Sequence, residues 1–600
     1  MRAESRASLS VHARRLVRQF GGLVSVIFLL GFVVYHLGWG AKVGINVAPT
    51  EQNFGETKIR FREVTAEIGP DFPWTSFKES ESEFINAGVI FRQPAALAVG
   101  EINRDSFMDV VLLNSTEPFI HVAFFDPAAK KFARQPKIES RLREARKAFQ
   151  RERPTAVLIT DIDGDRRTDF VVSYSVGCPL LFRSVAYSDF ASPAEPFGGE
   201  SCPMATTIAE ADVNFDGKTD FVFGQYSRGA NTASQANHKL NNKSMGGLST
   251  LLIRKEGTDF DFYHFPQKTF VTSVGFTYLA GMPSLAIFRG NDYSVDELNI
   301  LRDGKIRDIT ADRMPYAYHG FAGMNSEFFD FDKDGDLDLY VSNIYAPPFQ
   351  RRGNVFWVRN SDGTFSERSD EFGVRRCGFA WAGKFASFDN SGNYQLLVVN
   401  GVWENNDAAP TSMGDYWNIR TLRRVLPSFL QTDALIRKTD LYFSGNNQWC
   451  LFDFSKKPAV NIAPAAGVSL NSPTRSMALV DFDNSGRLSF VTADINGRLS
   501  VFKNESSELG NWIGLHLVPN HMALGARVVF ESLEPKIVRE VFPSNGYGAQ
   551  SDPRIHLGLG ARPADTVSVK VTLSNGNSKM FTLRGLGIYH QIDVSELGNP

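Results

Sequence analysis

Short acidic loops flanked by strand-like apolar segments recur along most of this 600-residue chain. The clearest copies are ITDIDGDRRTDFVVSYS (159–175), EADVNFDGKTDFVFGQY (210–226) and FFDFDKDGDLDLYVSNI (328–344). Weaker copies begin near residues 101, 277, 387 and 481. Most intervals are roughly 50 to 60 residues, which is typical of a blade of four short antiparallel strands. We therefore expect an all-β fold with a seven-bladed β-propeller over residues 60–508.

Three segments modify this repeat. The longer interval before the last loop contains residues 413–440, which we expect to be an inserted helical segment. A second helical insertion is expected near residues 134–153, with Leu142, Ala145, Ala148 and Phe149 on its inner face. The segment FREVTAEIG (61–69) precedes the first loop and is similar to a blade strand. We expect it to complete the last blade, because closing the ring removes exposed sheet edges.

The acidic loops place oxygen ligands at positions one, three, five and nine, with a backbone carbonyl at position seven. Without a cation, carboxylates this close together would raise one another's pKa and strain the turn. Calcium takes about six to eight oxygen ligands and tolerates irregular geometry. We therefore predict several structural Ca²⁺ ions.

The predicted ligands lie in five of the loops. They are Glu101, Asn103, Asp105 and Asp109 in the first; Asp161, Asp163, Asp165, the Arg167 carbonyl and Asp169 in the second; Asp212, Asn214, Asp216 and Asp220 in the third; Asp330, Asp332, Asp334 and Asp338 in the fifth; and Asp481, Asp483, Ser485 and Ser489 in the seventh. The loops near 277 and 387 are expected to bind no ion. The alternative for any such loop is a solvated turn held by side-chain hydrogen bonds. Position twelve is Val172, Phe223 or Val341, so these loops do not have the ligand set of an EF-hand switch.

The N-terminal residues predict a membrane anchor. Residues 20–39 carry no charged side chain and, as a helix, would rise about 30 Å, enough to cross the hydrocarbon layer. The arginine-rich residues 1–19 would stay in the cytoplasm. Residues 40–59 would be a linker, with the rest of the chain in the periplasm or outside the cell. A cleaved signal peptide is the alternative.

The order of these parts resembles a known family. The acidic loops look like the calcium-binding FG-GAP (VCBS) repeats of integrin-alpha-type propellers. Residues 509–600, which contain NWIGLHLVPNHMALGARVVF and REVFPSNGYGAQSDPRIHLGLG, resemble the ASPIC/UnbV module that follows such propellers in cartilage-acidic-protein-like chains of bacterial type. The resemblance implies a C-terminal β-sandwich-like module. It departs at TLSNG (572–576), which replaces the tryptophan-proline turn usual for the module.

Cysteine content leaves two interpretations open. The four cysteines are Cys178, Cys202, Cys377 and Cys450. A Cys178–Cys202 disulfide is possible in an oxidising compartment, and four buried thiols are the alternative.

Function is constrained mainly by what the sequence lacks. The formal net charge of −2 provides no basic field for nucleic acid. The sequence contains neither a G-x-S-x-G elbow nor an H-E-x-x-H helix motif. We expect a non-enzymatic, membrane-anchored scaffold for adhesion, binding or assembly, with a protein or glycan partner. The alternative is an extracytoplasmic enzyme acting on polysaccharide or another envelope polymer, with paired carboxylates in a central channel.

Overall fold

The described residues cover most of the chain after the linker. The computed structural model describes residues 55–74, 95–114, 117–147, 149, 154–174, 177–187, 189–198, 205–226, 246–257, 259–292, 294–315, 323–345, 352–401, 448–470, 472–495, 497–562 and 565–597. All of them belong to the unit Phe54–Pro600. The predicted tail (1–19), anchor (20–39), most of the linker and the insertion at 413–440 lie outside them. Among the described residues, no helix is both long and apolar enough to span a membrane.

Seven sheets within the described residues share one pattern, in which the first strand pairs with the second, the second with the third and the third with the fourth. All these pairings are antiparallel. In this order the sheets are β2 (Ala96–Gly100), β3 (Asp109–Leu113), β4 (Ile120–Asp126) and β5 (Lys131–Arg134); β6 (Pro154–Thr160), β7 (Asp169–Tyr174), β8 (Leu180–Phe182) and β11 (Glu195–Pro196); β12 (Thr207–Ala211), β13 (Asp220–Gly224), β14 (Thr250–Arg254) and β15 (Phe260–His264); β16 (Phe270–Thr277), β17 (Ala286–Asp292), β18 (Glu297–Arg302) and β19 (Lys305–Asp308); β20 (Asn325–Phe329), β21 (Asp338–Ser342), β22 (Val355–Arg359) and β23 (Phe365–Glu367); β24 (Ala380–Ala386), β25 (Gln395–Asn400), β26 (Cys450–Asp453) and β27 (Val460–Asn461); and β28 (Thr474–Val480), β29 (Ser489–Asp494), β30 (Leu499–Asn504) and β1 (Phe61–Glu63).

The first strands of these sheets contact one another in a closed circuit. Strand β2 contacts β6, and contacts continue through β12, β16, β20, β24 and β28, which returns to β2. Apolar side chains fill the space between neighbouring sheets, as Val111 and Val172 do between the first two. The prediction for residues 61–69 is confirmed, because β1 pairs with β30 through Phe61 and Asn504 and so joins the two ends of the repeat region.

Short helices and one hairpin connect these sheets. They are α2 (Thr65–Ile68), α4 (Pro136–Lys147), α6 (Thr310–Arg313), α7 (Ser369–Phe372), α10 (Ala463–Ala466) and the hairpin β9 (Ser184–Ala186) with β10 (Asp189–Phe190). Helix α4 confirms the predicted insertion: Leu142 and Ala145 are buried and Phe149 packs against the same cluster. Ala148, also predicted on its inner face, lies outside the described residues.

The interpretation of four buried thiols is wrong. Cys377 and Cys450 form a disulfide across 73 residues of sequence, a pairing that the sequence did not indicate. Cys178 is also disulfide-bonded, while its predicted partner, Cys202, lies outside the described residues.

The C-terminal residues form two further sheets. One has the order β33 (Ile537–Glu540), β32 (Arg527–Phe530), β36 (Thr566–Thr572) and β37 (Ser578–Arg584), and the other β35 (Ile555–Gly560), β31 (Asn511–Val518) and β38 (Tyr589–Asp593). Helix α11 (Asn520–Ala523) and the 3₁₀ helix η5 (Ser595–Leu597) complete this part. Both sheets contribute to one apolar core that includes Leu515, Phe530 and Val569, as expected for two packed sheets. We call residues 511–597 the C-terminal module.

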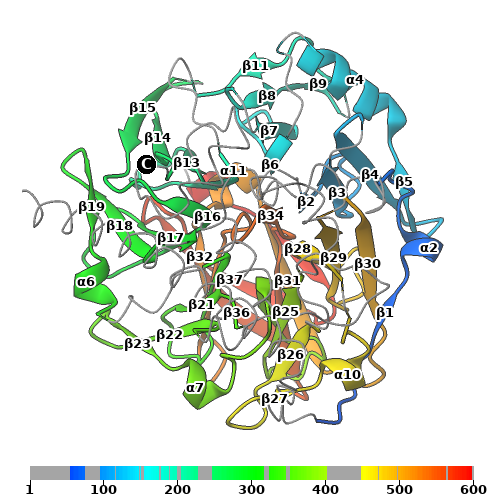
Figure 1. Ribbon diagram of the computed structural model, residues 1–600. Helices are drawn as coiled ribbons and strands as arrows, with labels where there is room; N and C mark the ends of the chain where they lie inside the picture. Colours follow the sequence, from blue (N-terminus) through cyan, green and yellow to red (C-terminus); the bar gives the residue numbers. More distant parts are fainter. Residues whose placement is uncertain are drawn as a thin grey trace, which may run out of the picture. The chain divides into compact units, whose positions relative to one another are not determined.

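Residues 543–552 of the C-terminal module, here called the central segment, contact the first strand of all seven sheets in the described residues. Its β34 (Ala549–Gln550) pairs in parallel with β2, and Figure 1 places β34 near the middle of the unit. The other contacts are Gln550 with the backbone of Ile159 (2.8 and 2.9 Å), Ser544 with Glu210 (3.2 Å), Gly546 with Val274, Tyr547 with Asn325 (3.3 Å), Asn545 with Lys384, and the Tyr547 carbonyl with Ser476 (2.9 Å). The central segment therefore occupies the space among the first strands.

Buried carboxyl groups in the sheets predict that stability falls as the pH rises from acid to neutral. Burial raises the pKa of Glu210 from 4.5 to about 7. Because this folded-state pKa lies above the unfolded value, the folded protein binds the proton more tightly, and protonation of Glu210 stabilises the fold. This stabilisation is complete below pH 4.5 and is lost as the pH rises through about 7. With chelator present, we expect the free energy of unfolding to decrease from pH 5 to pH 8, with Glu210 accounting for about 3 kcal/mol.

Urea unfolding at several pH values tests this prediction. Glu210→Gln should weaken the pH dependence of the free energy of unfolding, whereas the control Glu144→Gln, on the exposed face of α4, should preserve it. If the free energy of unfolding of Glu210→Gln fell with pH as steeply as that of the parent protein, Glu210 would not be the group responsible.

Candidate metal-binding loops

All seven predicted loops lie between the first and second strands of a sheet. Because each sheet starts with the same antiparallel hairpin and the first strands contact one another in turn, the loops gather at one end of the sheets. Six loops share one backbone conformation, with left-handed residues at positions four and six. These pairs are Arg104 and Ser106, Gly164 and Arg166, Phe215 and Gly217, Lys333 and Gly335, Asn390 and Gly392, and Asn484 and Gly486.

Loops with many carboxylates and loops with few adopt the same backbone conformation. The loop near 387 was predicted to bind no ion, yet it adopts the same turn, and the Ser387 hydroxyl accepts a hydrogen bond from Gly392 N at 3.1 Å. In the second loop, the two carboxylate oxygens of Asp161 accept hydrogen bonds from Gly164 N (2.8 Å) and Arg166 N (3.0 Å). The side chain at position one therefore holds the turn by hydrogen bonds.

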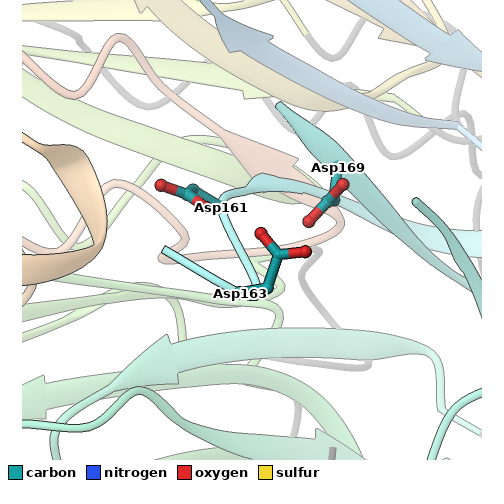
Figure 2. Close-up of side chains that lie close together, drawn as sticks. All are labelled: Asp161, Asp163 and Asp169. Atoms are coloured by element: carbon teal, nitrogen blue, oxygen red, sulfur yellow. The ribbon is translucent and has the colours of Figure 1, made fainter. Parts of the chain in front are cut away.

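Two loops bring three carboxylates together. Oxygens of Asp161, Asp163 and Asp169 lie within 4.8 Å of one another, and so do those of Asp330, Asp332 and Asp334. Figure 2 shows the three carboxylates of the second loop facing a common space. In the third loop, Asn214 replaces one carboxylate and its amide donates to Asp216 at 3.1 Å. Hard oxygen donors at this spacing fit a calcium ion.

The two carboxylate groups differ in how much positive charge the protein itself supplies. In the second loop, Arg183 pairs with Asp163 at 2.6 Å and Arg167 pairs with Asp165. Within the described residues, no lysine, arginine or histidine nitrogen lies within 4.0 Å of a carboxylate oxygen of Asp330, Asp332 or Asp334, and Arg359 pairs with Asp336 of the same loop at 3.2 Å. Burial, followed by repulsion from Asp334, raises the pKa of Asp332 to about 6. The fifth loop is therefore the stronger of the two candidate cation sites, although Arg539, which opposes the rise that burial causes in the pKa of Asp330, supplies some positive charge there.

The aspartate at position nine has a role that the sequence reasoning missed. Asp220 accepts hydrogen bonds from Val213 N and Arg254 N, both at 2.9 Å, and thereby ties the loop to the third strand. Asp109, Asp169 and Asp338 make the corresponding pair of bonds. Burial raises the pKa of Asp169 to about 7 and that of Asp220 and Asp338 to about 8. Each of these aspartates is the first residue of its second strand, which was a usable signal.

The C-terminal module contacts the position-one aspartates of four loops. The His521 ring lies 2.8 Å from Asp161, the Ser574 hydroxyl donates to Asp212 at 2.5 Å, Val538 N donates to Asp330 at 2.9 Å, and the Tyr589 hydroxyl donates to Asp481 at 3.1 Å. The module thus packs on the loops. The sequence assigned no role to any of these four partners, because they come from irregularly spaced positions.

The remaining predicted ligands lie in the first and seventh loops, where their side chains form hydrogen bonds within the protein. In the first loop, Asn103 donates to Asp105 at 2.9 Å and Glu101 accepts from Ser106 N at 2.6 Å. In the seventh, Ser485 donates to Asp483 at 2.6 Å, and the Ser489 hydroxyl accepts from Asn504 N at 3.1 Å. These side chains already have hydrogen-bond partners, although each carboxylate oxygen has a second lone pair for an ion.

Comparison with known proteins identifies one part of the chain. Residues 518–597 match the model of a family described as ASPIC and UnbV, which confirms the predicted identity of the C-terminal module. No curated protein matches the chain.

Two solved structures cover a larger part of the chain. They are described as crystal structures of BBS1N in complex with ARL6DN, soaked with mercury and with lead, and each is 9% identical over 70% of this chain. They are covered over 93% and 94% of their own length, with a TM-score of 0.37 in both cases. At this TM-score the similarity does not establish a shared fold.

The position-nine aspartate should stabilise the fold even without metal. Asp220→Ala leaves two buried N–H groups without their acceptor, so we expect it to lower the free energy of unfolding by about 2 to 4 kcal/mol. Urea unfolding in excess chelator measures this effect. The control Asp216→Ala, at position five of the same loop, should have little effect there. Equal stability of the parent and Asp220→Ala in chelator would contradict the structural role.

Proposed function

We propose that this chain is a calcium-binding, seven-bladed β-propeller of the FG-GAP/VCBS type, covered at its loop end by an ASPIC/UnbV module. The observation that carries the proposal is the closed circuit of contacts among the first strands of seven similar sheets, each with its loop at the same end. The sequence resemblance supports the same architecture.

The propeller would act as a membrane-anchored scaffold for adhesion, binding or assembly outside the cytoplasm. The apolar segment 20–39 supports the anchor. The Cys377–Cys450 disulfide supports an oxidising compartment. Because the C-terminal module contacts the acidic loops, the surface for a protein or glycan partner would lie at the opposite end of the sheets.

A binding role is favoured over catalysis by the central segment. The enzyme alternative requires two carboxylates in an open channel among the first strands. In this protein the central segment lies there and contacts all seven first strands. Among the first-strand carboxylates, Glu327 is paired with Lys384 at 2.6 Å, and the Glu210 carboxylate is fully buried and hydrogen-bonds Thr160. In the part of the chain that the structure describes, this arrangement supports a centre occupied by the chain itself and not by an open channel.

Partner binding can be tested with the full chain in detergent. We expect the calcium-loaded protein to retain a specific envelope protein, or a defined ligand on a glycan array, above the level of a heat-unfolded control. Failure to retain either, or turnover of envelope polysaccharide by the purified protein, would contradict the scaffold function.

Calcium should stabilise the protein mainly through the fifth loop. An ion that binds only the folded state raises stability by mass action. We expect the double variant Asp332→Ala, Asp334→Ala to lower the melting temperature in calcium and to leave that in chelator nearly unchanged. The matched control is Asp163→Ala, where Arg183 already balances part of the charge. A parent protein that melts alike with calcium and with chelator would refute the metal assignment.

A further inference from the structure

Two buried charged side chains from distant strands meet a half-buried asparagine of the central segment. Lys384 of β24 donates to Glu327 of β20 at 2.6 Å and also to the side-chain oxygen of Asn545 in the central segment. Glu327 in turn hydrogen-bonds the Asn545 side chain. The Lys384 and Glu327 side chains are only 2% and 9% exposed. Each member of this trio therefore contacts the other two.

We propose that Lys384 and Asn545 become joined by an intramolecular isopeptide bond, with Glu327 as the catalytic acid and base. An amine, a carboxamide and a carboxyl group held in mutual contact are the reactants and the proton carrier that this reaction needs. Holding them together in the folded state replaces an encounter between separate molecules, which is worth several orders of magnitude in rate.

The reaction balances without an oxidant or a further co-reactant. Glu327 takes one proton from the Lys384 ammonium, and the free amine forms the new bond from Nζ to Cγ of Asn545. The Cγ–Nδ2 bond breaks as Nδ2 receives a second proton from Nζ, relayed by Glu327. The departing ammonia then takes the proton held by Glu327 and leaves as ammonium, so Glu327 returns to its carboxylate form.

The surroundings of the trio support this chemistry. Burial raises the pKa of Glu327 above its usual value even though Lys384 lowers it, and a raised pKa suits a carboxyl group that accepts and returns a proton. A cavity of about 170 Å³ is lined by Glu327, Lys384 and Asn545 together with Phe329 and Phe385. This cavity gives the leaving group a place to move away from the new bond.

The bond would fasten the C-terminal module to the sheets covalently. Lys384 and Asn545 are 161 residues apart, and they belong to a first strand and to the segment that all the first strands surround. Hydrogen bonds to the loops could then break without release of the module. This inference does not depend on calcium or on a binding partner.

One competing reaction gives the same change in mass. The backbone nitrogen of Gly546 follows Asn545 and could attack the same carbon, forming a succinimide with loss of ammonia. That product would not contain Lys384, so replacing this lysine distinguishes the two reactions.

Mass spectrometry of the purified, reduced and denatured full chain tests the proposal. We expect a mass lower than that of the sequence by one ammonia, and a protease digest in which the peptide of Lys384 is linked to the peptide of Asn545. Lys384→Met and Glu327→Gln should each restore the full mass and abolish the linked peptide. The control Lys333→Met, on a loop lysine that contacts the Gly392 carbonyl at 2.8 Å, should retain both signatures.

Two outcomes would overturn the proposal. One is an unaltered protein of full mass whose digest contains only the separate linear peptides. The other is a loss of ammonia that persists in Lys384→Met, which would assign it to the succinimide. Neither outcome requires the variants to be stable, because the first is read from the unaltered protein and the second from covalent mass.

Discussion

The rest of the structure depends on the contacts between the central segment and the seven first strands. A first strand in this arrangement has a neighbour within its sheet on one side only, so its other edge carries backbone groups that need partners. The central segment provides them at β2, where Gly548 O accepts from Leu97 N at 2.9 Å, and at β6 through the Gln550 side chain. The C-terminal module thus completes the interior of the repeat domain.

Two kinds of side chain occur together in the acidic loops, those that hold the turn by hydrogen bonds and those that add negative charge, and the sequence alone does not distinguish them. Their position-one and position-nine side chains accept backbone N–H groups, and this need explains why Ser387 and Gln395 can stand where other loops have aspartate. The carboxylates at positions three and five add charge that the turn itself does not need. The protein balances this charge with arginines in the second loop. In the fifth loop, the described residues provide no ion pair to Asp332 or Asp334, and Arg359 pairs with Asp336 instead. Metal dependence should therefore differ between loops of nearly identical backbone.

The sequence predicted the parts of the fold that repeat, because each copy shows the same pattern of an apolar strand, an acidic turn and a second apolar strand. The seven loop positions, the closure by residues 61–69 and the helix at 136–147 followed from such patterns. The Cys377–Cys450 bond did not, because spacing cannot fix connectivity. The His521–Asp161 contact joins residues 360 positions apart. Asp161 belongs to the repeat, but His521 carries no periodic signal that could have identified it as the partner. The central segment escaped prediction because its glycine-rich sequence forms only a two-residue strand.

The contacts at Lys384 connect the interior to the loops. The cavity beside this lysine also reaches Asp330 of the fifth loop and Arg539 of β33, and Val538, next to Arg539, donates to Asp330. A single stretch of the C-terminal module, from β33 through the central segment, therefore contacts the fifth loop through Val538 and contacts Lys384 and Glu327 through Asn545. Fixing that stretch at Asn545 restrains β33 against Asp330, because the backbone from Val538 to Asn545 is only eight residues long. The position of the central segment and the geometry of the fifth loop are therefore mechanically linked.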